Sequence, residues 1–134
     1  MFGITFQELF WHVFLESINS LNNTIMIIDF NNMSFEDFPN FKGGEKQLTA
    51  KMFFDGTNRI MSAYLVPGAS IGLHTHDVNS EILFVLKGEG TLLDDGISTP
   101  IKAGQCAYCP KGHNHSLINT STENLEFVAC VPNQ

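Results

Sequence analysis

The segment GASIGLHTHDVNSEILFVLKG, which runs from Gly68 to Gly88, holds the pattern that decides the fold. Two of the five histidines of the chain, His74 and His76, stand two residues apart in it, and Glu81 follows five residues after the second. On an extended strand, residues i and i+2 project from the same face, with α-carbons about 6–7 Å apart. Two imidazoles on one face can converge on a metal ion. Because His-x-His alone is weak evidence, the interpretation depends on partners elsewhere in the chain.

Such partners are present in two places. Glu81 opens the apolar segment EILFVLKG, where a carboxylate is costly to bury unless it is paired or coordinates a metal. A second window, GQCAYCPKGHNHSLIN (residues 104–119), places His115 after a Pro-x-Gly turn and before another apolar strand. If two strands bring the windows together, they supply three imidazoles and one carboxylate. This nitrogen and oxygen donor set suits one divalent transition metal ion: Mn, Fe, Co, Ni or Zn.

Both windows resemble the two sequence motifs of the cupin superfamily. The first motif reads Gly, five residues, His-x-His, three or four residues, Glu, six residues, Gly, and the second reads Gly, five residues, Pro-x-Gly, two residues, His, three residues, Asn. The resemblance covers about residues 45–131. It implies a double-stranded β-helix, which is a small jelly-roll barrel, and it implies that His74, His76, Glu81 and His115 are the metal ligands. The matching positions are Gly68, His74, His76, Glu81, Gly88, Gly104, Pro110, Gly112, His115 and Asn119.

Short strands are also expected outside the two windows. QLTAKMFF (47–54) alternates apolar and polar residues, and Asp55-Gly56 predicts a hairpin turn into RIMSAYLV (59–66). Asp94-Asp95-Gly96 predicts a second hairpin between GTLL and STPIK. With LEFVACV near the C-terminal end, the pattern predicts an all-β sandwich or barrel. Positive φ angles are expected at Gly68, Gly88 and Gly104, and Asn119 is expected to fasten a turn through its side chain.

The first 25 residues differ from the rest, so we expect an N-terminal helical extension (1–25) ahead of the cupin domain (26–134). Thr5 and Glu8 form a capping box, and the apolar residues that follow have helical spacing. A second interpretation starts the natural protein at Met26. TIMIID (24–29) reads as a short apolar strand. The apolar face of the expected helix over 6–21 consists of Phe6, Leu9, Phe10, Val13, Phe14, Ile18 and Leu21.

Composition excludes several classes of function. With a net charge of −7 and only seven Lys and Arg residues, the chain cannot build the basic face that nucleic-acid binding needs. The first cation is Lys42, which argues against a secretory signal and against an interfacial membrane helix. Three cysteines form an odd set typical of reduced thiols, so a cytoplasmic location is expected. The spacing of Cys106 and Cys109 fits buried strand cysteines better than a zinc knuckle, which needs a second pair.

Four residues are candidates for catalytic roles. Glu81 could leave the metal and act as a base, and His113 shares strand parity with His115, although an exposed imidazole fits its turn position better. Arg59 would anchor a carboxylate or phosphate if it points inward, but the alternation of its strand leaves the direction open. Tyr64 is a further acid–base candidate. We expect a small apolar cavity lined by Met52, Phe54, Met61, Leu83, Val85 and Phe127.

Three functions are consistent with this pattern. The first is a metal-dependent enzyme, of dioxygenase type in preference to an isomerase or lyase, that acts on a small carbonyl, enol or carboxylate compound. The second is a non-catalytic metal-containing protein that binds a small molecule, and the third is a metal-stabilised structural protein. A homodimer with N-terminal residues at its interface is expected, because small jelly rolls leave sheet edges to cover.

Overall fold

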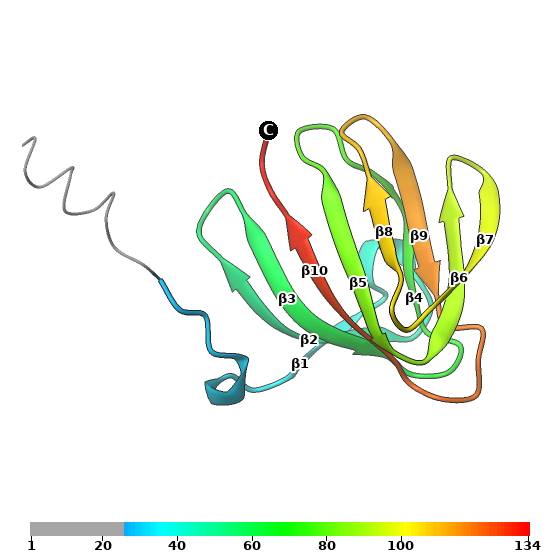
Figure 1. Cartoon of the computed structure of the whole chain (residues 1–134), viewed down its shortest axis with the longest axis horizontal. Helices are drawn as coiled ribbons and strands as arrows, with labels where there is room; N and C mark the ends of the chain where they lie inside the picture. Colours follow the sequence, from blue (N-terminus) through cyan, green and yellow to red (C-terminus); the bar gives the residue numbers. More distant parts are fainter. Residues whose placement is uncertain (1–25) are drawn as a thin grey trace, which may run out of the picture.

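Two β-sheets pack face to face in a small barrel-like sandwich, shown by a computed structural model that describes residues 26–134 (Figure 1). The larger sheet has six strands in the order β1-β2-β3-β10-β5-β8, and the smaller has four in the order β4-β9-β6-β7. This confirms the all-β jelly-roll prediction, whereas the helix expected over 6–21 lies outside the described residues. The elements are η1 (Phe30–Asn32), β1 (Glu36–Pro39), η2 (Phe41–Gly43), β2 (Gln47–Phe54), β3 (Arg59–Leu65), β4 (Ser70–Thr75), β5 (Glu81–Lys87), β6 (Glu89–Asp94), β7 (Ile97–Lys102), β8 (Cys106–Cys109), β9 (Asn114–Ile118) and β10 (Leu125–Val131).

Both predicted hairpins are present, and turn chemistry explains each. In the β2–β3 turn, the Asp55 carboxylate accepts hydrogen bonds from the backbone N–H groups of Thr57 and Asn58 at 2.9 and 2.7 Å. In the β6–β7 turn, Asp95 and Gly96 have φ angles of +44° and +82°, as a type I′ turn requires. The two turns fix the register of the strands on either side of them.

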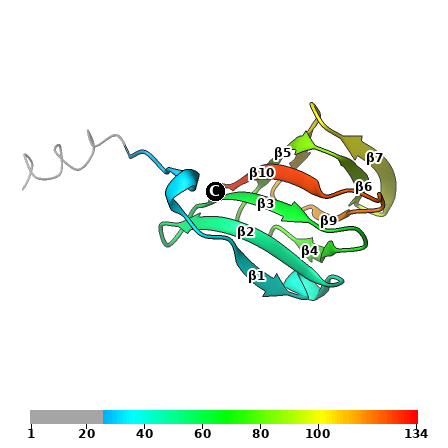
Figure 2. The ribbon, with the colours of Figure 1, turned by 90° about the horizontal axis from the view of Figure 1, so that it is seen from below.

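The core fills the space between the sheets with alternate residues of the facing strands. Figure 2 shows β2, β3 and β10 side by side, and their inward residues include Leu48, Leu65 and Phe127, each at most 1% exposed. Asn119 is also 1% exposed, and its amide donates to the carbonyls of Leu65 and Glu123, both at 2.7 Å. The structure thus confirms that Asn119 ties chain segments together through its side chain.

Two local predictions were wrong. The described part of TIMIID forms no strand, because Asp29 turns the chain into η1 by accepting a hydrogen bond from the N–H of Asn31. Only Cys109 of the CAYC cysteines is buried; residues three apart on a strand face opposite sides, so Cys106 is exposed. Within residues 26–134, no helix is both long enough and apolar enough to cross a membrane.

Candidate metal centre

Strands β4 and β9 place two of the predicted donors directly opposite each other. Ile71 pairs with Leu117 and His74 pairs with His115. The chain therefore moves three positions along β4 where it moves two along β9. This β-bulge changes the parity of β4. As a result, Ile71 and His74 both line the same cavity, while Leu73 turns outward and is 57% exposed. Beyond the bulge, His76 keeps the inward direction that His-x-His spacing predicts.

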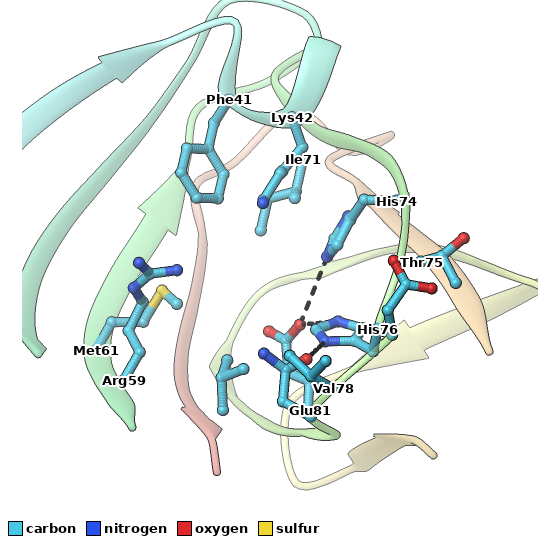
Figure 3. A pocket seen from close by; sticks show the side chains of 13 residues that line it. Phe41, Lys42, Arg59, Met61, Ile71, His74, Thr75, His76, Val78 and Glu81 are labelled. Carbon is cyan, nitrogen blue, oxygen red and sulfur yellow. Dashed lines mark hydrogen bonds and ion pairs between the residues drawn. The ribbon is translucent and has the colours of Figure 1, made fainter. Parts of the chain in front are cut away.

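A loop before β2 closes over the bulge. A Cβ atom on Gly72 would lie 2.6 Å from the backbone nitrogen of Gly44, and a Cβ on Gly44 would lie 2.8 Å from the nitrogen of Gly72. Only glycine at both positions permits this approach, because real Cβ atoms do not come so close to backbone. The contact brings η2, with Phe41 and Lys42, to the edge of the cavity (Figure 3).

The donor atoms of His74, His76, Glu81 and His115 all lie within 4.8 Å of one another. Glu81 Oε2 is 2.8 Å from His115 Nε2, 3.1 Å from His76 Nε2 and 3.9 Å from His74 Nε2. The Nε2 atoms of His76 and His115 are 3.0 Å apart. Three of the four residues are 5% exposed, and His74 stands at the more open side. The windows identified in the sequence are therefore joined at one point inside the barrel.

Hydrogen bonds at the outer ring nitrogens set the orientation of two imidazoles. His74 Nδ1 donates to the carbonyl of Gly72 at 2.8 Å, and His76 Nδ1 donates to Oδ1 of Asn79 at 2.6 Å. When each ring is neutral with its proton at Nδ1, its Nε2 lone pair points at the cluster. Lone pairs this close to a carboxylate oxygen repel it unless a cation or a proton lies between them. This arrangement would suit metal ligands, whose outer ring nitrogens are usually held by protein acceptors.

The pKa values of the cluster reflect the same crowding. Burial alone would raise the pKa of Glu81, but hydrogen bonds from His115 and His76 outweigh it and lower the pKa to about 2. The hydrogen bond with Glu81 raises the pKa of His76, whereas loss of hydration lowers the pKa of His74. The Glu81 carboxylate is therefore negative at neutral pH, and a cation held by the cluster would neutralise this charge.

The spacing of the donors fits a transition metal. Ligands bound at about 2.1 Å lie about 3.0 Å apart when they are adjacent in an octahedron and about 4.2 Å apart when they are opposite. The separations of 2.8–3.1 Å match adjacent positions, and 3.9 Å between His74 and Glu81 comes close to opposite ones. Three neutral imidazoles and one carboxylate are a donor set for Mn, Fe, Co, Ni or Zn. The residues present therefore could hold one such ion, and the structure does not distinguish among these metals.

A cavity of about 180 Å³ adjoins the cluster, and its walls differ from the prediction. Of the six expected wall residues, only Met61 lines it. Leu83, Val85 and Phe127 lie in the core, and Phe54 is 55% exposed. Alternation along a strand predicts the face of a side chain but not its depth in the barrel, which explains the error. The lining residues are Phe41, Lys42, Arg59, Met61, Ile71, His74, Thr75, His76, Asp77, Val78, Asn79, Glu81 and Val131.

Two of the catalytic candidates lie away from the cavity. Tyr64 faces the outer side of β3, where its ring packs edge-on against Phe35 at 5.2 Å between centroids. His113 is exposed and its Nδ1 contacts the Asp95 carboxylate in the β6–β7 turn. Neither position supports a catalytic role. Arg59, in contrast, points inward with Met61 and lines the cavity.

Sequence reasoning missed two residues of the site, Lys42 and Asn79. Lys42 precedes a Gly-Gly pair, which is a signal for close backbone approach, but the sequence does not say which strand is approached. Asn79 follows His76 by three residues and accepts its Nδ1 proton. A short polar residue after a predicted ligand is the kind of partner that ligand histidines need.

Comparisons with known proteins agree with this architecture. Residues 61–131 match the family model described as Cupin domain. A curated oxalate-binding protein of Thermotoga maritima is 34% identical over 114 residues, which cover 81% of this chain and 94% of the relative. A crystal structure of a predicted oxalate decarboxylase from Thermotoga maritima has a TM-score of 0.75 at 31% identity and covers 81% of this chain and 100% of that one. A cupin from Shewanella frigidimarina, at 17% identity with a TM-score of 0.67 over 83% of this chain and 93% of its own, shows a shared fold only.

Proposed function

Because this chain belongs to the cupin superfamily, we propose that it binds a small carboxylate compound at a metal ion held by His74, His76, Glu81 and His115. The observation that carries this proposal is the position of the donor cluster beside a cavity that Lys42 and Arg59 also line, with His74, His76 and Glu81 in the cavity wall. A bound divalent ion would supply a Lewis acid for a carboxylate oxygen. Four protein donors are fewer than the six that octahedral ions take, which leaves room for the ligand. The oxalate-binding relative supports a carboxylate as the ligand.

In this proposal, different residues hold the ion, orient the histidines and surround the bound compound. The four donors hold the ion, and Gly72 and Asn79 keep His74 and His76 in the orientation that exposes Nε2. Ile71, Met61 and Val131 form an apolar wall that limits water around the ligand. The cations at the cavity attract an anion.

An enzyme is the second candidate, and the presence of Asp77 in the cavity wall favours it. A carboxylate in reach of a bound compound can accept a proton, as dioxygenase, isomerase or lyase chemistry on an enolisable compound requires. We rank binding first, because Tyr64 and His113, the other acid–base candidates, lie away from the cavity.

The proposal is tested by elemental analysis of the purified protein followed by calorimetric titration with oxalate, with and without metal. We expect about one equivalent of a divalent transition metal, and oxalate binding that disappears after chelation and returns with the metal. Metal-free protein that binds oxalate equally well would refute the proposal. Oxygen consumption or product formation with carboxylate and enolisable compounds would favour the enzyme instead.

We also propose that the protein is a cytoplasmic homodimer. Its three free thiols fit a reducing compartment. The outward face of the large sheet carries an apolar row across five strands, where antiparallel sheets that face water are usually polar: Phe53, Ile60, Cys130, Ile82 and Tyr108. A second copy would cover this row. Light scattering should give twice the chain mass for the wild type and a monomer for Tyr108→Glu, and a monomeric wild type would contradict the dimer.

A further inference from the structure

We infer that the natural ligand is a dianion with two to four carbons, and that Arg59 and Lys42 select it by holding the acidic group that the metal does not bind. This inference rests on the proposed function and adds the number of charges on the ligand and the residues that recognise the second one.

The position and the unpaired N–H of Arg59 suit the binding of an anion. It is the first residue of β3 and shares the inward face with Met61, Ala63 and Leu65. Its Nε is buried and has no hydrogen-bond partner among residues 26–134. A buried guanidinium N–H without an acceptor is costly, so it indicates a missing partner. One face of the guanidinium lies 5.1 Å from the Phe54 ring centroid, which holds the group in place. Figure 3 shows it across the cavity from His74 and Glu81.

Lys42 adds a second positive charge at the mouth of the same cavity. It has a φ angle of +56° within η2, a backbone conformation that is unfavourable for a residue other than glycine, Asn or Asp. The contact of Gly44 with Gly72 holds the loop in this position. No carboxylate of the described residues forms an ion pair with Lys42. Figure 3 shows its side chain running from η2 beside Ile71 toward the cavity.

The charges around the cavity favour a ligand with two negative groups. The chain carries a net charge of −7, yet two of its seven Lys and Arg residues line this one cavity. The acidic residues of the wall are Glu81 and Asp77. The Glu81 carboxylate contacts His76 and His115 and would bind the metal, and Asp77 is exposed at the edge. A divalent ion together with Arg59 and Lys42 therefore leaves a net positive cavity, which a single carboxylate does not neutralise.

The size of the cavity limits the length of the dianion. A cavity of about 150 Å³ in another protein holds benzene, which has six non-hydrogen atoms, and the cavity here is slightly larger at about 180 Å³. A ligand of about six to eight non-hydrogen atoms fits this space, and dicarboxylates with two to four carbons have that size. Guanidinium groups bind carboxylates in a planar, two-pronged manner that lysine does not reproduce.

Both selecting residues precede the part of the chain that matches the cupin domain, residues 61–131. That part of the chain supplies all four metal-binding candidates. The metal centre and the recognition of the second acidic group thus come from different segments, so they can be separated by mutation.

The test uses the full-length, metal-loaded protein in calorimetric titrations with oxalate, malonate and succinate, and with acetate and glycolate as single-charge probes. We expect at least one dicarboxylate to bind about 10-fold or more tightly than either monocarboxylate. Arg59→Gln and Lys42→Gln should each weaken dicarboxylate binding by about 10-fold or more, weaken monocarboxylate binding much less, and keep the metal content of the wild type. Lys87→Gln is the matched control, because Lys87 is exposed outside the cavity and within residues 26–134 forms an ion pair with Glu126 alone, at 4.0 Å.

The outcomes separate this inference from the proposed function. If dicarboxylates and monocarboxylates bind the wild type equally, or if both variants keep the full preference, the selection by Arg59 and Lys42 is wrong while metal-dependent carboxylate binding stands. If the metal-loaded wild type binds none of the five compounds, the proposed function itself fails. Metal content and circular dichroism of each variant show that a loss of binding is not a loss of fold.

Discussion

Gly44 lies against Gly72 with no room for a side chain at either position, and the carbonyl of Gly72 is the group that orients His74. We therefore expect Gly44→Ala to displace the bulge in β4 and to weaken metal binding as well as the fold. A loss of about 1–3 kcal/mol in the free energy of unfolding is typical of such overpacking. Urea unfolding of the metal-free protein and competition titrations with a metal chelator measure the two effects.

Gly104→Ala serves as the control for this change. Gly104 has a φ angle of +87° and nothing within 4 Å of an added Cβ, so its substitution strains the backbone alone. The control should lose stability and keep its metal affinity. If Gly44→Ala also keeps full metal affinity, the loop does not position His74.

Removal of one imidazole should empty the metal centre without unfolding the barrel. We expect His76→Ala to remain folded, because the core of Leu48, Leu65 and Phe127 does not involve the metal, and to lose most of its metal. Elemental analysis and circular dichroism give the two readouts. His113→Ala removes an exposed imidazole outside the cluster and should keep its metal. Full occupancy in His76→Ala would show that this residue is not a ligand.

The side chain of Asn79 should affect metal affinity although it contacts His76 at Nδ1 and does not face the cluster. Loss of the acceptor for His76 Nδ1 in Asn79→Ala should lower metal affinity by about 10–100-fold. Asn79→Asp keeps an acceptor oxygen in the same position and should retain most of the affinity. Equal losses in both variants would indicate a general disturbance of the loop instead of a lost hydrogen bond.

The stability of the metal-free protein should depend on pH through the residues of the cluster. The raised pKa of His76 means that its pair with Glu81 stabilises the fold fully below the ordinary histidine value of 6.5, and that this contribution disappears as the pH rises through the folded pKa. On the acid side, the contribution of Glu81 to stability is present above pH 4.5 and is lost as the pH falls toward its folded pKa of about 2. The pKa of His74 is lowered by burial, so His74 reduces the stability of the fold below pH 6.5.

Urea unfolding of chelated protein between pH 6.5 and 8.5 isolates the His76 contribution. The free energy of unfolding should fall more with rising pH in the wild type than in His76→Ala. Metal affinity should change in the opposite direction, because the proton on His76 must leave before the metal binds. Identical pH profiles in the two proteins would contradict the raised pKa.

Strands and turns were predictable from the sequence because their causes are local. Alternation in QLTAKMFF and the Asp-Gly turns depend on neighbouring residues only, and the structure confirms both hairpins. The missing strand at residues 26–29 shows the limit of this reasoning. A short apolar run forms a strand only if another strand is available to pair with it, which is a property of the whole fold.

The site was predictable where spacing alone brings residues together. The structure gathers the four motif residues into one cluster, and their role as ligands stays a prediction. The direction of Arg59 could not be predicted, since both faces of β3 carry apolar residues and only packing against β10 decides between them. Lys42 reaches the cavity through a contact between segments 28 residues apart, Gly44 and Gly72, which no local pattern reveals.

The bulge between Ile71 and His74 gives β4 one residue more than β9 has opposite it, and the site residues on both sides of the bulge still face the barrel. Deletion of Leu73, an exposed residue, would restore regular pairing between β4 and β9, and alternation from Ile71 would still turn His74 and His76 inward. Strand β9 has no such extra residue, so deletion of Ser116 would reverse the direction of His115 relative to Leu117. Among natural variants of this chain, a one-residue deletion should therefore be more frequent at Leu73 than at Ser116.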